Sequence, residues 1–448
     1  MQDINQLSKL LIPPAGKIDI SLAMPGSKSI SNRVLLIAAL AKGQSRLHNL
    51  LNSVDTKVML KALKGLGVEY KFFNDQQQSH FLIKGKEGIF DAHQGDINIE
   101  NSGTAARFLA TALNLGAGSD YLLTGNERMK QRPILDLLKA LQLNGLKVTS
   151  VDKAGYLPLK VVPRPLNGGS IKINGSNSSQ YISALMIVAP YAKKDTTIII
   201  EGELVSRGYV EMTQRIMIEF GAKVVFIEKN KILIEAGTTY QGREYIIEAD
   251  ASSASYFLAL AAITGGQITI KDITRASLQR DIEFIFLLEK MGCKVLWGEK
   301  SVKLIGAQKL LALGNVDMHH ISDVAPTLAV VAVFAKGTTN IINVENMRIK
   351  ECDRISALVT ELKKLGVAIK ESAKGISITG VSSGLNAKNI DLATYDDHRM
   401  AMSFSLLATK IPGVSILDPG CVAKTFPNYF DMLFKAIKSS HKSIPKAI

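Results

Sequence analysis

One pattern occurs six times along this chain of 448 residues. Each copy has a polar start rich in Ser, Thr, Asp or Asn, then a short run of almost uninterrupted apolar residues, then a turn and a β-branched stretch. Successive copies begin roughly 70 to 80 residues apart, which is long for a solenoid repeat but suits a unit of the βαβαββ type. We therefore expect six copies of one α/β unit. The copies begin at Ser27, Asn101, Ser178, Ala251, Ser322 and Asp396.

A second pattern lies between these copies and predicts an amphipathic helix that ends in glycine and leads into a short strand. A helix that is apolar on every side must be buried on every side, whereas an amphipathic helix can lie near the surface. The sequence thus predicts bundles of buried helices with sheets outside them, in two halves of three units. The glycines expected to take the left-handed conformation after the amphipathic helices are Gly67, Gly145, Gly221, Gly292 and Gly366.

The length of the chain exceeds what one ordinary hydrophobic core holds, so two domains are expected. The best boundary lies near residues 247–250, after the third unit. A strand-like stretch at residues 18–23 precedes the first unit and by itself could pair with either half. The predicted domains are residues 24–248 and, as a second lobe, residues 1–23 together with 249–448.

The charge balance is basic, with 54 Lys and Arg against 40 Asp and Glu and a net charge of +14. Such an excess either serves an anionic partner or keeps the protein in solution. The cations are spread thinly along the chain with few aromatic residues between them, which favours small anions over nucleic acid. A basic nucleic-acid-binding protein remains a remote alternative.

The cysteines and the apolar runs indicate where the protein works. Cys293, Cys352 and Cys421 lie far apart and form no CxxC motif, which indicates reduced thiols in the cytoplasm. The first residues do not have the pattern of a signal peptide, and apolar runs such as residues 325–335 are much shorter than a membrane span. We expect a cytoplasmic monomer that contacts neither membrane nor nucleic acid.

Several polar motifs fall at the starts of the apolar helices. A helix start presents free N–H groups and a partial positive charge, so it binds phosphate or carboxylate readily, although Ser, Thr and Asp there usually only cap the helix. Capping is the preferred interpretation for Ser252 and Ser253, where no cation accompanies the helix start. Elsewhere cations suggest a common cleft that holds two polyanions. They are Lys28, Arg33, Arg107, Arg132 and Arg399.

The stretch NMRIKECDRI, residues 346–355, places three cations around two carboxylates. Charge runs are usually solvated loops, but this one lies just ahead of an amphipathic helix, which favours a loop that faces the cleft. The chain has no HExxH, EF-hand or complete GxGxxG motif, Lys28 lacks the phosphate-loop frame, and His319 and His320 are expected at a strand end. We infer neither a metal nor a nucleotide cofactor.

Seven motifs in order, from about Pro25 to Phe430, resemble the 5-enolpyruvylshikimate-3-phosphate synthase family: PGSKSISNR, NSGTAARF, RMKQRP, SSQ, NMRIKECDR, DDHRMAM and KTFPNYF. The resemblance implies a two-domain inside-out α/β barrel with three βαβαββ units per domain and the active site in the cleft. It implies transfer of the enolpyruvyl group of phosphoenolpyruvate to the 5-hydroxyl of shikimate 3-phosphate with release of phosphate, by addition and elimination through a tetrahedral intermediate. This is a step toward chorismate and the aromatic amino acids.

The resemblance also assigns residues to roles. It implies Asp323 as base and Glu351 as acid, with Lys28 and Lys424 stabilising charge. Shikimate 3-phosphate would be bound by Lys28, Ser29, Arg33, Ser178, Ser179, Gln180, Ser206, Tyr209, Asp323, Asn346 and Lys350. Phosphoenolpyruvate would be bound by Lys28, Gly103, Arg132, Gln180, Arg354, Arg399 and Lys424.

Some positions depart from the common family pattern. Phe108 could shift the helix that carries Gly103, and Met347 stands where tryptophan is frequent. The nearest alternative is the sister enzyme that transfers enolpyruvyl to UDP-N-acetylglucosamine on the same fold. That enzyme typically has Lys-Asn in place of Lys28-Ser29 and a loop cysteine in its N-terminal half, whereas all three cysteines here follow residue 247.

Overall fold

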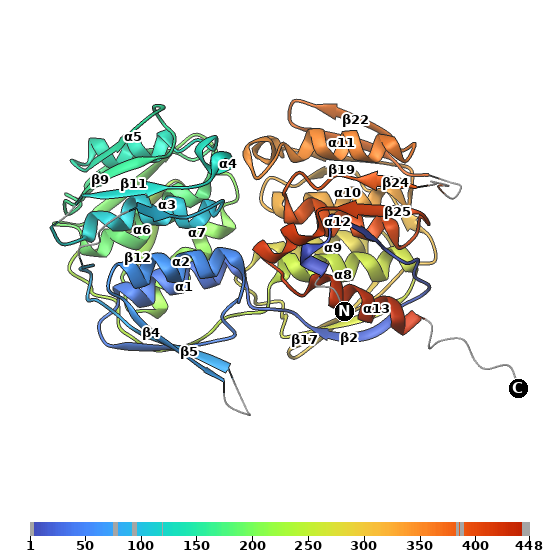
Figure 1. Cartoon of the computed structure of the whole chain (residues 1–448), viewed down its shortest axis with the longest axis horizontal. Helices are drawn as coiled ribbons and strands as arrows, with labels where there is room; N and C mark the ends of the chain where they lie inside the picture. Colours follow the sequence, from blue (N-terminus) through green and yellow to red (C-terminus); the bar gives the residue numbers. More distant parts are fainter. Residues whose placement is uncertain are drawn as a thin grey trace, which may run out of the picture. The chain divides into compact units, whose positions relative to one another are not determined.

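The computed structural model describes residues 4–74, 79–91, 96–118, 120–381, 385 and 389–440. The chain divides into two compact units (Figure 1). One unit is Gly26–Glu248, and the other combines Met1–Pro25 with Ala249–Ile448.

The unit of residues 26–248 is built around three buried helices: α1 (Lys28–Leu40), α3 (Gly103–Ala112) and α6 (Ser179–Val188). All ten residues of α3 are buried because the helix carries small and apolar residues on every side. Three four-stranded sheets surround these helices, and each has one parallel pair followed by antiparallel pairs. Their orders are β14 (Glu244–Ile246), β3 (Gln44–His48), β5 (Ser79–Lys84), β4 (Glu69–Asn74); β6 (Asp96–Asn98), β7 (Tyr121–Thr124), β9 (Leu159–Val162), β8 (Lys147–Ser150); and β10 (Gly169–Asn174), β11 (Thr196–Glu201), β13 (Lys231–Ile234), β12 (Val224–Glu228).

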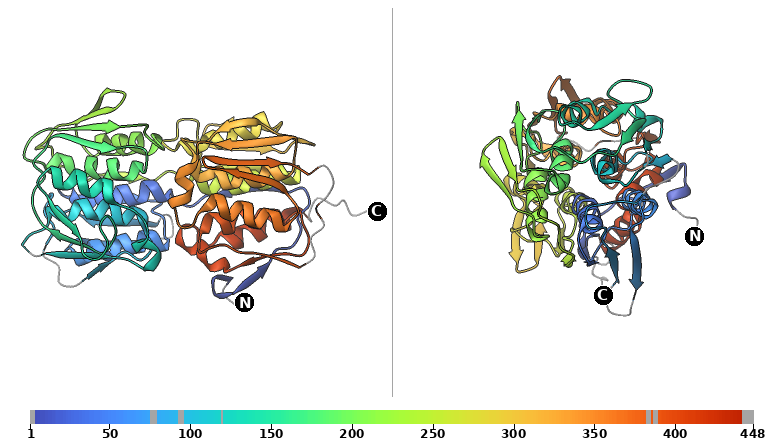
Figure 2. Two further views of the ribbon diagram at one scale, coloured as in Figure 1. Left: turned by 90° about the horizontal axis from the view of Figure 1, so that it is seen from above. Right: turned by 90° about the vertical axis from the view of Figure 1, so that its left-hand side faces the viewer.

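The other unit repeats this plan around α8 (Ala251–Thr264), α10 (Ala325–Val333) and α12 (His398–Ala408), which are buried along their whole length. Figure 2 shows the helices of each unit side by side with strands outside them. Two of its sheets have four strands, one has three, and a short ladder joins β18 (Leu310–Leu311) to β20 (Ala335–Lys336). The larger sheets are β16 (Lys294–Gly298), β17 (Ser301–Ile305), β15 (Gln267–Lys271), β2 (Asp19–Ala23); β19 (Gly314–Asp317), β21 (Thr338–Ile342), β23 (Gly375–Thr379), β22 (Ala368–Ser372); and β1 (Lys9–Leu11), β25 (Val414–Leu417), β24 (Ile390–Leu392).

The start of the chain completes this second unit. The strand-like stretch that could have paired with either half forms β2, which pairs in parallel with β15. The sixth repeat departs from the other five, because in the described part of the chain its last helix, α13 (Tyr429–Ser439), is not followed by a hairpin. Its sheet is instead completed by β1, which pairs antiparallel with β25.

The second helix of each of the first five repeats is amphipathic, as the sequence predicts, with its apolar side buried. The five glycines after these helices all have positive φ angles, between 75° and 101°, so the left-handed helix ends are confirmed. The helices are α2 (Val54–Gly65), α5 (Leu135–Leu143), α7 (Gly208–Glu219), α9 (Glu283–Lys290) and α11 (Arg354–Lys364). Buried helices with outer sheets confirm the predicted α/β fold.

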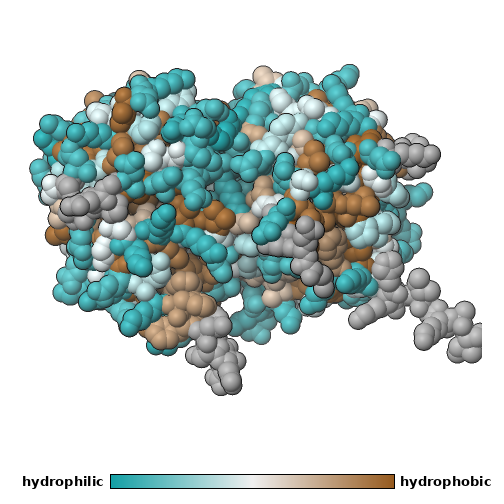
Figure 3. All heavy atoms as spheres, viewed as in Figure 1, coloured by the Kyte–Doolittle hydropathy of each residue, from teal (hydrophilic) through white to brown (hydrophobic). Residues whose placement is uncertain are grey.

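The surface in Figure 3 is mostly hydrophilic, with smaller apolar areas between the polar residues. Among the residues described, no helix has the length and apolar character to cross a lipid bilayer.

Candidate functional site

The predicted site residues of the unit that contains residues 249–448 come together at the starts of its helices. Asp323 lies in the 3-10 helix η5 (Ser322–Val324), directly before α10. Arg354 is the first residue of α11, Arg399 lies in the first turn of α12, and Lys424 ends the 3-10 helix η7 (Pro419–Lys424). Helix starts of the fifth and sixth repeats, together with the end of η7, therefore supply the charged groups.

Arg354 is the centre of this cluster and is only 1% exposed. Its Nε donates to Asp397 Oδ2 at 2.7 Å, its Nη2 donates to Glu351 Oε2 at 2.8 Å, and its Nη1 donates to Asp323 Oδ1 at 3.3 Å. Burial lowers the pKa of Arg354, but the attraction of Asp397, Glu351 and Asp323 outweighs burial and raises the pKa above its ordinary value. Arg354 therefore stays charged and links three carboxylates.

Asp323 contacts two further cations. Arg399 Nη2 lies 2.7 Å from Asp323 Oδ2, and Lys350 Nζ lies 3.6 Å from Oδ1. The side chain of Asp323 keeps 18% of its surface exposed, so it is the more accessible carboxylate beside the buried Arg354 and Arg399. A partly exposed carboxylate surrounded by cations suits a proton acceptor.

Glu351 is 8% exposed and accepts from two cations. Lys424 Nζ lies 3.0 Å from its Oε1, and Arg354 binds its other oxygen. Asn346, in the 3-10 helix η6 (Glu345–Ile349), donates to Ser322 Oγ at 3.0 Å, next to Asp323. The structure thus gathers every site residue predicted in this half into one cluster.

In the unit of residues 26–248, α1 carries two predicted site residues at its start, Lys28 and Ser29. Lys28 is the first residue of α1, behind the N-cap Ser27, whose side chain accepts from Ile30 N. Its Nζ lies 3.8 Å from Asp55 Oδ2 in α2, and its side chain is 16% exposed. Lys28 therefore combines an ammonium group with the partial positive charge of a helix start.

Arg33 follows one turn later and is buried. Its Nε donates to Thr213 Oγ1 at 2.6 Å, its Nη1 to Ser29 O at 2.9 Å, and its Nη2 to Ser183 Oγ and Tyr209 O at 3.1 and 3.3 Å. Burial lowers the pKa of Arg33 to about 10. These hydrogen bonds compensate the burial and tie α1, α6 and α7 together.

Phe108, which departs from the family pattern, packs against this arginine. Its ring centroid lies 5.3 Å from Arg33 Cζ, and the ring of Tyr209 lies 5.7 Å from the same atom. Cation–π contacts of this kind favour a fixed guanidinium. Phe108 thus helps to set the position of Arg33, which is predicted to bind shikimate 3-phosphate.

Gly103 and Arg132 form a close pair. Gly103 is the first residue of α3, and a Cβ atom added to it would lie 2.7 Å from Arg132 Nη2 and 2.8 Å from Nη1. Arg132 is 6% exposed, so its guanidinium is held against the start of α3. The absence of a side chain at Gly103 lets backbone and guanidinium meet at one place, where both could bind one anion.

The SSQ motif forms the start of α6. Ser178 is the N-cap and accepts from Gln180 N at 3.2 Å. Gln180 Nε2 donates to Thr104 Oγ1 at 3.2 Å, and this hydrogen bond joins α6 to α3.

Ser206 is 6% exposed and has a φ of 51°, an unusual conformation for a residue with a side chain. Backbone strain of this kind persists where the surroundings hold it and is often found at functional sites.

Two sequence-based interpretations need correction. Ser252 does not cap α8: the N-cap is Asp250, which accepts from Ser253 N at 2.6 Å, whereas Ser252 Oγ donates to the buried Asp281. Arg107, grouped with the cleft cations, donates to Pro133 O at 2.9 Å and Gly103 O at 3.2 Å. It supports the backbone beside Arg132 rather than serving as a separate anion site.

The sequence analysis missed Asp397 as the main partner of Arg354. The signal was present in the motif DDHR, whose second carboxylate precedes the helix by one residue and caps it by accepting from Arg399 N. Within the described residues, no group of three or more His, Cys, Asp or Glu side chains is arranged to hold a metal ion.

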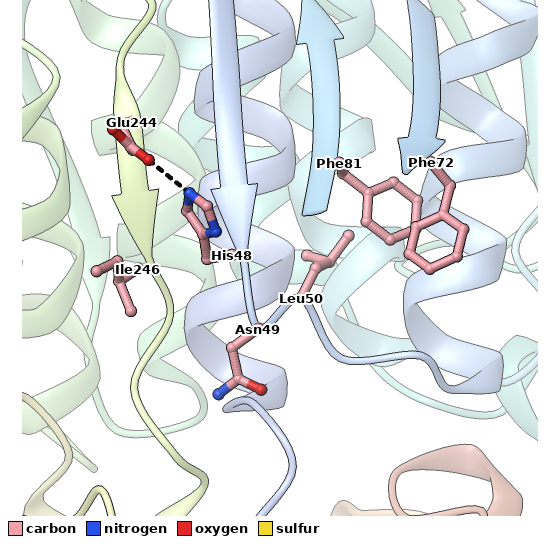
Figure 4. Close-up of a pocket in the computed structure, with 7 residues that line it drawn as sticks. All are labelled: His48, Asn49, Leu50, Phe72, Phe81, Glu244 and Ile246. Carbon is pink, nitrogen blue, oxygen red and sulfur yellow. Dashed lines mark hydrogen bonds and ion pairs between the residues drawn. The ribbon is translucent and has the colours of Figure 1, made fainter. Parts of the chain in front are cut away.

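A pocket of about 470 Å³ lies elsewhere in the unit of residues 26–248 (Figure 4). It is formed where β3, β4, β5 and β14 meet, and His48 Nε2 lies 2.7 Å from Glu244 Oε1 on its wall. None of the predicted site residues lines it. Its lining residues are His48, Asn49, Leu50, Phe72, Phe81, Glu244 and Ile246.

Comparisons with known proteins show the family of the chain. The family model for EPSP synthase (3-phosphoshikimate 1-carboxyvinyltransferase) matches residues 12–433. Proteins named 3-phosphoshikimate 1-carboxyvinyltransferase from Photobacterium profundum and Sulfurovum sp. are 46% and 45% identical to the chain, over 95% of this chain and 98% and 99% of theirs. A relative of the same name from Trichormus variabilis is 43% identical over 96% of this chain and 100% of its own.

The fold also matches solved structures. An EPSP synthase structure from Acinetobacter baumannii superposes with a TM-score of 0.79 at 25% identity, covering 96% of this chain and 98% of that one. The chain therefore belongs to the EPSP synthase family and is a 3-phosphoshikimate 1-carboxyvinyltransferase, which transfers the enolpyruvyl group of phosphoenolpyruvate to shikimate 3-phosphate in the shikimate pathway.

Proposed function

We propose that residues of both compact units bind the two substrates, shikimate 3-phosphate and phosphoenolpyruvate. The residues proposed for shikimate 3-phosphate are Lys28, Ser29, Arg33, Ser178, Ser179, Gln180, Ser206, Tyr209, Asp323, Asn346 and Lys350. The residues proposed for phosphoenolpyruvate are Lys28, Gly103, Arg132, Gln180, Arg354, Arg399 and Lys424.

The observation that supports this proposal most strongly is the connected set of ion pairs around Arg354. Its members come from four separate stretches of the sequence, yet each lies within 3.6 Å of another member. Four cations around three carboxylates suit anionic substrates whose reaction needs both a proton acceptor and a proton donor. The set comprises Asp323, Lys350, Glu351, Arg354, Asp397, Arg399 and Lys424.

The reaction proposed for these residues has two steps. In the first, Asp323 accepts the proton of the 5-hydroxyl of shikimate 3-phosphate while the hydroxyl oxygen bonds to C2 of phosphoenolpyruvate. A proton from Glu351 reaches the methylene carbon of phosphoenolpyruvate in the same step. The product is a tetrahedral adduct in which Lys28 and Lys424 stabilise the phosphate charge. In the second, Glu351 takes a proton back from the new methyl group, and the C–H electrons form the double bond to C2. The bond from C2 to the phosphate oxygen breaks at the same time, and phosphate departs with its bonding electrons and the proton that Asp323 had accepted.

The donor role of Glu351 depends on its surroundings. Two cations contact its carboxylate, and this arrangement favours the ionised form. Its burial opposes ionisation, and the ammonium of Lys424, 3.0 Å away, can pass a proton between Glu351 and the substrate. We therefore assign Glu351 and Lys424 together to protonation of the methylene carbon.

We further propose that residues 24–248 and residues 1–23 with 249–448 act as the two functional lobes, and that the chain works as a cytoplasmic monomer. The two compact units support the lobes, and the three free cysteines suit a reducing compartment. Light scattering coupled to size-exclusion chromatography tests the monomer, because a mass near twice 48.6 kDa contradicts it.

One assay tests the assignment of substrate and site together. Phosphate release from phosphoenolpyruvate is measured with shikimate 3-phosphate and with UDP-N-acetylglucosamine as acceptors, for the parent protein and for Asp323→Asn. We expect release with shikimate 3-phosphate alone and its loss in the variant. Parental turnover in Asp323→Asn removes this residue from the mechanism.

A further inference from the structure

The helix α11 carries a second buried charge on the face that carries Arg354. Glu361 lies two helical turns after Arg354 and is 1% exposed. Its Oε2 accepts from Ala393 N at 2.9 Å, and its Oε1 accepts from the hydroxyl of Tyr395 at 2.7 Å. Glu361 therefore binds the segment of the chain that leads into α12.

This segment contains a tight turn at residues 394–397, closed by a hydrogen bond of 3.0 Å from Asp397 N to Thr394 O. Both central residues of the turn have positive φ angles, 57° at Tyr395 and 52° at Asp396. A side chain makes this conformation unfavourable, and a bulky residue such as tyrosine adopts it more rarely than aspartate does. The turn therefore persists because its surroundings hold it.

α11 holds the turn at two places. At the end of the turn, Asp397 Oδ2 accepts from Arg354 Nε at 2.7 Å, and at its beginning Glu361 accepts from Tyr395. Burial raises the pKa of Tyr395 and the hydrogen bond to Glu361 adds to the rise, so the hydroxyl keeps its proton and remains a donor. Lys364 Nζ, 2.7 Å from Glu361 Oε2, compensates the buried charge.

Asp397 connects the turn to the residues proposed to bind anions. Its fully buried carboxylate accepts from the side chain of Arg354 and from the backbone N of Arg399 at the start of α12. The guanidinium groups of both arginines donate to Asp323. A displacement of Asp397 therefore changes where both guanidinium groups lie.

We propose that Glu361 is a positioning residue of the transferase reaction. It holds the turn of residues 394–397 in its left-handed conformation and thereby fixes Asp397. Asp397 then orients Arg354 and Arg399, the two arginines of this unit that are proposed to bind phosphoenolpyruvate. The inference rests on the proposed roles of these arginines.

The first test is Glu361→Gln, which keeps the size of the side chain but has one acceptor oxygen in place of two. Either Ala393 N or the hydroxyl of Tyr395 then loses its acceptor. We expect KM for phosphoenolpyruvate to rise about tenfold, because a hydrogen bond to a charged acceptor is lost, with a smaller change in KM for shikimate 3-phosphate. Hydrogen exchange of residues 393–397, followed by mass spectrometry, should become faster.

The second test is Tyr395→Phe, which removes only the hydroxyl that donates to Glu361. Tyr395 is 42% exposed, so this variant keeps the inference testable if Glu361→Gln does not fold. We expect KM for phosphoenolpyruvate to rise about threefold, as for the loss of one ordinary hydrogen bond. In the double variant the rise should stay near that of Glu361→Gln alone, because both changes break the same contact.

The matched control is Tyr429→Phe in the same unit. The hydroxyl of Tyr429 is buried and lies 2.7 Å from Ser405 Oγ, away from the turn of residues 394–397. This variant should lower the melting temperature and leave KM for both substrates at the parental values. It therefore separates a general loss of stability from a displaced turn.

The outcomes separate the two proposals. A parental KM for phosphoenolpyruvate in either Glu361→Gln or Tyr395→Phe overturns the role of Glu361. Unchanged hydrogen exchange of residues 393–397, or an equal rise in KM in Tyr429→Phe, overturns it as well. Arg399→Lys is measured alongside, and a parental KM for phosphoenolpyruvate in that variant overturns the proposed role of the arginine instead.

Discussion

Nη2 of Arg399 lies 2.7 Å from Oδ2 of Asp323, so the proposed base is held by a cation that is also proposed to bind phosphoenolpyruvate. Asp323→Ala should lower kcat on the order of 100-fold or more, because the variant lacks the group proposed to accept the hydroxyl proton. Binding of both substrates should persist, since the variant removes a negative charge from a site for anions. Steady-state kinetics and calorimetric titration measure the two effects.

The control for this variant is Asp391→Asn in the same unit. Asp391 forms a surface ion pair with Lys9, and its side chain is 39% exposed. Its kcat and KM values should match those of the parent. Parental turnover in Asp323→Ala contradicts the proposed base.

Glu351→Gln should also lower kcat, again on the order of 100-fold, because the amide has no carboxyl proton to deliver. The substitution keeps the size of the side chain, so Arg354 and Lys424 should stay near their positions. Single-turnover measurements with phosphoenolpyruvate and shikimate 3-phosphate test it. A variant that turns over at the parental rate shows that Lys424 or water supplies the proton without Glu351.

Gly103→Ala should weaken the binding of phosphoenolpyruvate. The new Cβ would lie 2.7 Å from Arg132 Nη2, so the guanidinium must move away from the start of α3. We expect KM for phosphoenolpyruvate to rise about tenfold, roughly the loss of one charge-assisted hydrogen bond, with a smaller change in KM for shikimate 3-phosphate. Gly16→Ala is the control, because its Cβ meets Ser440 Cβ at an ordinary 3.5 Å. Equal KM values in the parent and Gly103→Ala contradict the proposed site.

Asp397→Asn should destabilise the unit that contains it. Asp397 is fully buried, accepts from Arg354 Nε at 2.7 Å and caps α12. The variant removes one of the three carboxylates that compensate the buried charge of Arg354, so we expect the free energy of unfolding to fall by about 3 kcal/mol. Urea denaturation measures it, with the exposed Asp391→Asn expected to change stability by less than about 1 kcal/mol. Similar values for both variants indicate that Asp397 contributes little to stability.

The repeat, the buried helices and the helix ends follow from the sequence, because each depends on residues within a few turns of one another. Gly67 and Gly366 illustrate this, since the apolar spacing before each one predicts the helix end and the positive φ that the structure has. The residues of the Arg354 cluster other than Asp397 were also predictable, through motifs that resemble a known family.

Only the tertiary structure decided the partners. Arg354 and Asp397 are 43 residues apart in the chain, and Ser252 and Asp281 are 29 apart, so no local pattern specifies that they meet. The same holds for β2, which joins β15, and for β1, which completes the sheet of the sixth repeat. Local periodicity determines which faces are apolar, whereas pairing between distant segments depends on how all the apolar faces are buried at once.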